Sequence, residues 1–135
     1  MNPYSGTPLF KKLGYKPGMV AHVAGEPQHY FDLLTGLPAE IEFVQEPKAG
    51  TLDFVHLFVD RQEDLARLLP IMRALIKSNG MIWVSWPKKS SKVPTDMTGD
   101  ASRANAFPLD LVDIKVCAVD EVWTAQKLMI RKELR

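Results

Sequence analysis

Three short runs of apolar residues constrain the fold of this chain more than any other feature of its sequence. They read MVAHVA, TLDFVHLFV and MIWVSW, and they span Met19–Ala24, Thr51–Val59 and Met81–Trp86. Continuous apolar runs of this length are typical of strands that are buried on both faces of a parallel sheet. Both faces of such a sheet must be covered, so the runs predict an α/β fold.

Helical patterns separate these runs. The apolar residues of Gln62–Ile76 fall at offsets 0, 3, 4, 7, 10 and 11 from Leu65, which places them on one helical face. We expect Pro70 to kink this helix or to mark a break in it. Three other helices are predicted, at about Thr98–Phe107 with Thr98 as the N-cap, at Thr7–Leu13 with Ser5 or Thr7 as the cap, and at Gln28–Leu34.

Three more segments complete the predicted sheet, at Ile41–Gln45, Asp113–Val119 and Trp123–Arg131. The last two are joined by residues 120–122 alone, which is too short for a crossover, so they must be antiparallel neighbours. A length of 135 residues suits a single domain that spans residues 1–135. The predicted fold has three layers, with helices on both faces of a mostly parallel sheet and an antiparallel C-terminal strand.

Composition excludes several classes of protein. A single cysteine excludes an internal disulfide framework and a cysteine-rich zinc site. The apolar runs are far shorter than the roughly 20 residues of a membrane-spanning helix. The N-terminal segment MNPYSGTPLF lacks the pattern of a secretory signal, so a cytoplasmic location is expected.

The net charge is +1, from 17 basic and 16 acidic residues, so neither a nucleic acid nor a membrane is expected as a partner. The charge is nevertheless uneven. Residues 40–64 contain seven acids and two bases, whereas Lys11, Lys12 and Lys16 make the start basic and four bases between Lys127 and Arg135 make the end basic. We interpret these segments as solvated surface, with a weak anionic partner at the basic ends as the alternative.

Two segments of the sequence resemble a known fold. LDFVHLFVDRQEDLARLLPIMRALIKSNGMIWVSWPK is similar to the central strand–helix–strand unit of S-adenosylmethionine-dependent methyltransferases, and DIKVCAVDEVWTAQKLMIRK resembles the antiparallel finish of that Rossmann-like fold. Nearly the whole chain also resembles a bacterial family of small proteins known only as a domain of unknown function, through YSGTPLFKKLG, DFVHLFV, WVSWPKKSSKVPTDMT and VDIKVCAVDEVW. That family implies a fold but no activity.

The turn after the first strand departs from the methyltransferase pattern. That family has a glycine-rich turn there, which lets the backbone approach the cofactor, whereas HVAGEPQHY contains Gly25 alone and then Glu26. A carboxylate at a helix start disfavours a phosphate or a dinucleotide. The same carboxylate is less unfavourable for a cofactor that has a positive sulfonium group and ribose hydroxyls, such as S-adenosylmethionine. The resemblance implies that Glu46 is the acid that would hold the ribose.

Candidate ligand-binding residues lie at the carboxyl ends of the predicted parallel strands. They surround the point where the strand order reverses, between the strand that ends at Ala24 and the strand that ends at Val59. Asp60 is expected either to accept a hydrogen bond from a ligand or to cap the helix that follows it. Lys88 and Lys89 would hold an anion, with Asp96 as a base or orienting group, unless their loop is simply solvated. The predicted lining comprises Gly25, Glu26, Asp60, Arg61, Ser85, Trp86, Lys88 and Lys89.

No metal site is predicted. His22 and His56 lie on strands that would be adjacent, but no third ligand is spaced to complete a site. We therefore interpret each as a core histidine with a hydrogen-bond partner. Cys117 lies in the middle of a strand and is interpreted as inert packing.

Three functions stay open on this basis. The preferred hypothesis is a non-catalytic or regulatory module that binds an unknown small molecule or protein, because the sequence has no catalytic constellation. The second is a methyltransferase-like enzyme with a degenerate glycine motif and S-adenosylmethionine at Gly25, Glu46 and Asp60. The third is an interaction subunit that pairs, for example as a homo-oligomer, through Trp123–Arg131.

Overall fold

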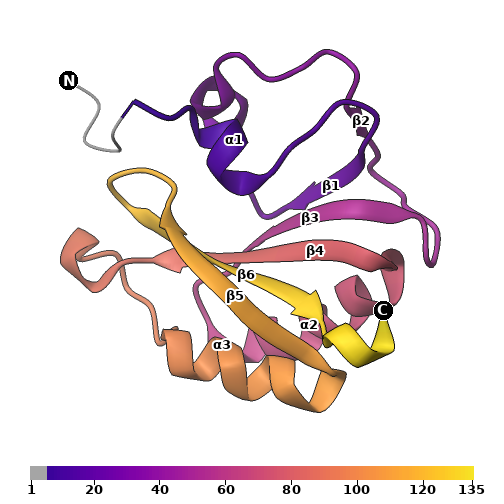
Figure 1. The fold of residues 1–135 in the computed structure, drawn as a ribbon. Coiled ribbons are helices and arrows are strands. Elements are labelled where there is room, and N and C mark those ends of the chain that lie inside the picture. The colour runs from indigo at the N-terminus through magenta and orange to yellow at the C-terminus, as the bar shows by residue number, and fades with distance from the viewer. Residues whose placement is uncertain (1–5) are drawn as a thin grey trace.

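The sheet has six strands in the order β2-β1-β3-β4-β6-β5, in a computed structural model that describes residues 6–135. Strands β1, β2, β3 and β4 are parallel, and β6 runs antiparallel to both β4 and β5 (Figure 1). The predicted mostly parallel, Rossmann-like sheet with one antiparallel C-terminal strand is therefore confirmed. The strands are β1 (Val20–Ala24), β2 (Glu42–Phe43), β3 (Leu52–Phe58), β4 (Ile76–Pro87), β5 (Leu111–Ala118) and β6 (Trp123–Ile130).

Helices cover both faces of the sheet (Figure 1). One core contains Val55, Val84 and Leu128 and packs against the two longer helices. The other contains Phe54, Trp83 and the buried residues of the N-terminal helix. The helices are α1 (Leu9–Leu13), α2 (Gln62–Leu75) and α3 (Gly99–Ala106), with short 3-10 segments η1 (Tyr30–Leu34), η2 (Lys89–Ser91), η3 (Phe107–Leu109) and η4 (Lys132–Leu134).

Several helix predictions are refined by the structure. Thr98 caps α3, because its hydroxyl accepts the Ala101 N–H at 3.0 Å. Thr7 does not cap α1, which begins after Pro8 without a side-chain cap, and Ser5 lies outside the described residues. The predicted helix at Gln28–Leu34 is only a short 3-10 segment, which begins at Tyr30 and has no side-chain cap at its start.

Strand β6 lies inside the sheet, where it pairs with β4 on one side and with β5 on the other. Pairing of a partner along Trp123–Arg131 is therefore wrong as a hypothesis, because the backbone of this segment already serves two neighbours. The sheet edge on this side is β5. Within residues 6–135, no helix is both long and apolar enough to cross a bilayer.

Candidate functional site

The strand order reverses between β1 and β3, as predicted. These strands are parallel neighbours, but β1 leads to β2 on one side and β3 leads to β4 on the other. Open α/β sheets bind ligands in the crevice outside the carboxyl ends of strands at such a point. Here lies a cavity of about 280 Å³, the switch-point crevice, lined by Gly25, Phe58, Val59, Asp60, Asp64, Arg67, Leu68 and Trp123.

Gly25 is required by the packing of β1 on β3. Its φ is +73°, and a Cβ at this position would lie 2.5 Å from the backbone oxygen of Phe58. Side chains rarely adopt this backbone conformation, and no Cβ fits so close to a carbonyl oxygen. Close approach between two strand ends therefore accounts for the one glycine of this turn.

Asp60 presents an exposed carboxylate to the crevice. Its side chain forms no hydrogen bond or ion pair with any residue from 6 to 135, and only its backbone oxygen is used, by the Thr95 hydroxyl at 2.7 Å. The other acid of the lining, Asp64, is paired with Arg67 at 3.2 Å. Asp60 is thus the carboxylate that is available to a ligand.

Asp96, and not Asp60, serves the start of α2. The Asp96 carboxylate accepts the backbone N–H of Gln62 at 2.7 Å, and the Gln62 side chain donates back to the Asp96 carbonyl at 2.6 Å. The expectation that Asp60 caps this helix is therefore wrong. A carboxylate at a helix N-terminus satisfies a free N–H and the positive end of the helix dipole.

Trp123 forms the far wall of the crevice. Its ring packs edge-on against Phe58, with ring centroids 5.0 Å apart. This tryptophan is not among the site residues that were predicted from the sequence. The signal was available: because β6 is antiparallel, its first residue lies at the edge where the parallel strands end.

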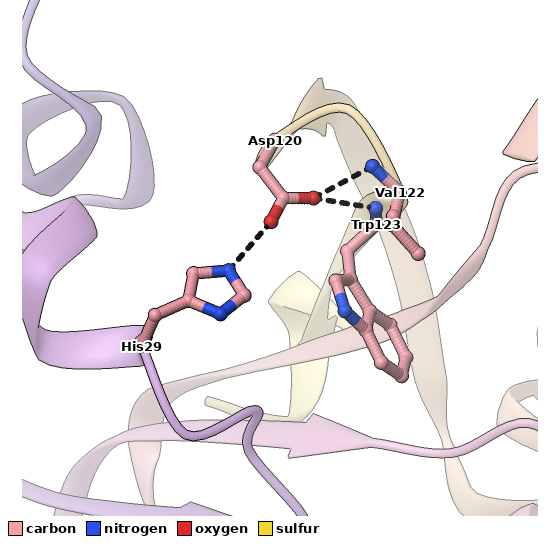
Figure 2. A network of polar contacts seen from close by, with 4 residues as sticks. All are labelled: His29, Asp120, Val122 and Trp123. Carbon is pink, nitrogen blue, oxygen red and sulfur yellow. Dashed lines mark hydrogen bonds and ion pairs between the residues drawn. The ribbon is translucent and has the colours of Figure 1, made fainter.

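A carboxylate fixes the turn that carries Trp123. The Asp120 Oδ1 accepts the N–H groups of Val122 and Trp123, both at 2.8 Å, and its Oδ2 lies 2.9 Å from His29 Nε2 (Figure 2). Burial alone would raise the pKa of Asp120, but the hydrogen bonds from Trp123, His29 and Val122 hold that pKa below its usual value. The turn is thereby tied to the start of η1.

A buried chain of polar side chains lies beneath the crevice, on the α1 side of the sheet. Tyr15 and Tyr30 have hydroxyls 2.6 Å apart, Tyr30 OH lies 2.8 Å from His56 Nδ1, and His56 Nε2 lies 2.7 Å from Ser85 Oγ. Burial lowers the pKa of His56 from 6.5 to about 3 and raises the tyrosine pKa values. The imidazole is therefore neutral.

The two strand histidines do not face each other. His22 is opposite Val55 in the β1–β3 register, whereas His56 is opposite Val23, so the imidazoles point to opposite faces of the sheet. His22 Nδ1 lies 2.7 Å from the Val44 carbonyl oxygen. Both have the hydrogen-bond partners predicted for core histidines. No group of three metal-ligating side chains occurs within the described part of the chain.

The remaining candidate residues are dispersed. Trp86 and Lys89 line a separate cavity of about 400 Å³ together with Met97, Thr98 and Arg103. Ser85 is fully buried, and Lys88 donates its backbone N–H to the Val122 oxygen at 2.8 Å. Glu26 and Glu46 are exposed and outside the crevice lining. The crevice unites Gly25 and Asp60 with Asp64, Arg67, Leu68 and Trp123, which were not predicted.

A larger cavity, of about 460 Å³, lies on the other side of the β5–β6 turn. It is lined by the start of α1, by Leu33 and Thr35, and by Ala118 to Glu121. The Asp120–His29 pair thus lies next to this cavity, while Trp123 faces the crevice.

Comparison with known proteins supports the fold. No family model matches the chain, and no curated protein matches it in sequence. The resemblance to the bacterial family of unknown function therefore stays a prediction. The chain does resemble a solved structure described as a candidate type 11 methyltransferase from Sulfolobus solfataricus, with a TM-score of 0.66, 11% identity, and coverage of 92% of this chain and 90% of the other.

Two further solved structures show the same likeness. An S-adenosylmethionine-dependent methyltransferase from Aquifex aeolicus gives a TM-score of 0.59 at 12% identity and covers 90% of this chain and 87% of its own. The Burkholderia thailandensis 1,6-didemethyltoxoflavin-N1-methyltransferase, solved with S-adenosylhomocysteine, gives 0.59 at 12% identity and covers 92% and 75%. This chain therefore has the Rossmann-like fold of S-adenosylmethionine-dependent methyltransferases.

Proposed function

We propose that this protein binds S-adenosylmethionine in the switch-point crevice and acts as a methyltransferase-like enzyme. The observation that carries the proposal is the unpartnered Asp60 carboxylate in a crevice that also presents the Trp123 indole. The fold and the position of the crevice at the strand reversal agree with it. Among the structural neighbours, two are described with bound S-adenosylhomocysteine.

The chemistry of the lining fits a cationic ligand. A carboxylate attracts a positive charge, and the face of an indole attracts cations through its quadrupole. Asp60 and Trp123 supply one of each. A phosphate would meet only Arg67 in the lining, and this guanidinium is already paired with Asp64. The sulfonium group of S-adenosylmethionine is therefore a better match for the crevice than a phosphate.

Each residue then has a role in binding. Asp60 would accept hydrogen bonds from the ligand's ammonium or hydroxyl groups, and Trp123 would lie against its cationic part. Gly25 keeps the floor of the crevice free of a side chain. Glu46 is exposed and outside the crevice lining, and its role at the ribose rests on the resemblance to methyltransferases alone. When bound, the cofactor supplies an electrophilic methyl group to an acceptor.

A non-catalytic binding module is the second candidate. The crevice lining contains no histidine, cysteine, tyrosine or lysine among the described residues, so Asp60 is its sole available base. The Ser85–His56 pair has the atoms of a nucleophile and a base, but both side chains are fully buried. This observation favours ligand binding without bond making.

Binding is tested by unfolding with and without the ligand. One millimolar S-adenosylmethionine should stabilise the protein by about 4 kcal/mol if its Kd is near 1 μM. Asp60→Asn should weaken binding at least tenfold, while Glu40→Gln, a change at another exposed acid, should leave it within twofold. Absence of stabilisation by both S-adenosylmethionine and S-adenosylhomocysteine would contradict the proposal. Binding without transfer of a labelled methyl group to any acceptor would favour the second candidate.

A further inference from the structure

The two basic ends of the chain meet on one face of the sheet. Lys127 on β6 is directly opposite Lys115 on β5. Lys127 alternates with Ala125 and Met129, which belong to the core on the α1 side, so its side chain points to that face. Helices α2 and α3 lie on the other face of the sheet (Figure 1).

The N-terminal segment brings Lys16 to the same face. The end of α1 lies over β4, because the Leu13 oxygen accepts the Trp83 indole N–H at 2.7 Å. Trp83 is paired in the sheet with Lys127. Tyr15, the residue before Lys16, stacks on Phe54 at 3.9 Å. Lys16 therefore directly follows Tyr15, whose ring lies over β3, the strand next to the one that carries Trp83.

The side chain of Arg135 adds a fourth cationic group. The Arg135 Nε donates to the Ile130 oxygen at 2.6 Å, which holds this side chain at the end of β6. Burial lowers the pKa of Lys127, and the charges of Lys115, Lys16 and Arg135 lower it further. All three cations are thus within electrostatic reach of Lys127. We call Lys16, Lys115, Lys127 and Arg135 the basic face.

Acidic side chains do not neutralise the basic face. The acids nearest in the sequence are engaged elsewhere: Asp113 with Arg103 at 3.7 Å, and Glu133 with Arg131 at 3.5 Å. Among residues 6–135, Lys16, Lys115 and Lys127 form no ion pair with an acid. Like charges directly opposite each other on adjacent strands are destabilising, so the Lys115–Lys127 pair costs the fold stability.

We propose that the basic face binds the phosphate backbone of a single-stranded nucleic acid. Lys16 follows the turn after α1, Lys115 and Lys127 lie on two strands, and Arg135 lies beyond β6, so a chain of phosphates can offer an anion to each of them. Proteins that bind single strands combine such a cationic track with aromatic side chains on which bases stack. Trp123 lies on the same strand and face as Lys127 and is half-buried.

A lipid bilayer is a poorer match for this face. Stable attachment to a membrane needs apolar insertion as well as charge. Along β6, the residues beside Lys127 on this face are Ala125, which is fully buried, and Met129, which is half-buried. Neither projects an exposed apolar side chain, so β6 supplies no inserting group beside Lys127.

The test is the binding of fluorescent single-stranded DNA and RNA oligonucleotides of one sequence, followed by anisotropy. Neutralising four phosphates of a single strand gives a slope of about −3 for log K against log salt. Lys16→Glu with Lys115→Glu should weaken binding at least tenfold at low salt. Lys48→Glu with Lys92→Glu, the same charge change at exposed positions outside the face, should weaken it less than threefold.

Each outcome bears on the proposal. Tight binding that the first pair of substitutions abolishes and the second spares supports it, and the two oligonucleotides show whether DNA or RNA is preferred. Equal losses in both pairs, a slope near zero, or binding to anionic phosphatidylserine vesicles but to neither oligonucleotide would overturn it. No cofactor takes part in the assay, so its result is independent of S-adenosylmethionine binding.

Discussion

The Nε2 atom of His56 lies 2.7 Å from the Ser85 hydroxyl in a core where neither side chain is exposed. The other ring nitrogen is 2.8 Å from the Tyr30 hydroxyl, so both nitrogens have partners. A neutral imidazole, with one donor and one acceptor, satisfies this arrangement, whereas protonation would place an unpaired charge in the core. The geometry therefore makes this part of the fold sensitive to acid.

The pH dependence of stability follows from His56. Its pKa is about 6.5 in the unfolded chain and about 3 in the native protein, so the unfolded state binds a proton that the native state does not. Stability is then lost as the pH falls from 6.5 towards 3, at up to about 1.4 kcal/mol per pH unit from this group. Urea unfolding between pH 7 and pH 4 measures the slope.

His56→Leu is the matched variant for this measurement. It removes the titrating group, so the loss of stability between pH 6 and pH 4 should be smaller than in the unmodified protein. At pH 7 it should itself cost about 1–3 kcal/mol, because Tyr30 and Ser85 lose their partner. An identical slope in both proteins would show that other groups cause the acid sensitivity.

Gly25→Ala is expected to destabilise the protein more than an ordinary glycine substitution. The new methyl group would meet the Phe58 oxygen at 2.5 Å in addition to the strain of a φ of +73°. Gly18→Ala is the control, since Gly18 has a φ of +90° and open space around it. Backbone strain alone costs about 1–2 kcal/mol. Thermal or urea unfolding should show the Gly25 variant to be weaker, and equal costs would mean that the close approach is relieved by a small movement of the strands.

Asp96→Ala should cost about 0.5–2 kcal/mol, because α2 loses the carboxylate that accepts the Gln62 N–H. Asp60→Ala is the control, because it also removes one carboxylate near the start of α2. It should change the free energy of unfolding by less than about 0.5 kcal/mol. Lys88→Ala with Lys89→Ala, in the same loop as Asp96, should be similarly neutral. A larger cost for Asp60→Ala than for Asp96→Ala would mean that α2 is capped from Asp60 after all.

The sequence predicts β1, β3 and the second half of β4 well, because each is a continuous apolar run that needs no partner to be recognised. It misses the start of β4 at Ile76, which the helical pattern of Gln62–Ile76 includes. It does not predict which side chains meet across the sheet. A one-residue difference in the β1–β3 register decides that His22 and His56 point to opposite faces, and no local pattern encodes it. The hydrogen bond between Asp96 and Gln62 is not predicted either, because the two residues are 34 positions apart in the sequence and only the fold brings them together. The net charge of +1 does not predict the basic face, because it is the sum of an acidic middle segment and two basic ends, and the fold brings these ends together.

Lys115→Glu separates stability from binding at the basic face. In the native register Lys115 is opposite Lys127, and the substitution turns a repulsive cross-strand pair into an attractive one. Cross-strand pairs of opposite charge contribute about 0.2–1 kcal/mol, so the variant should be more stable than the unmodified protein. The gain should shrink at 1 M salt, because exposed charges are screened there. Urea unfolding at low and high salt measures both effects, with Lys92→Glu as the control for net charge.

Lys115→Glu should also weaken oligonucleotide binding, since a cation of the basic face is replaced by an anion. A variant that is less stable and still binds would show that Lys115 serves the strand pairing and not an anionic ligand.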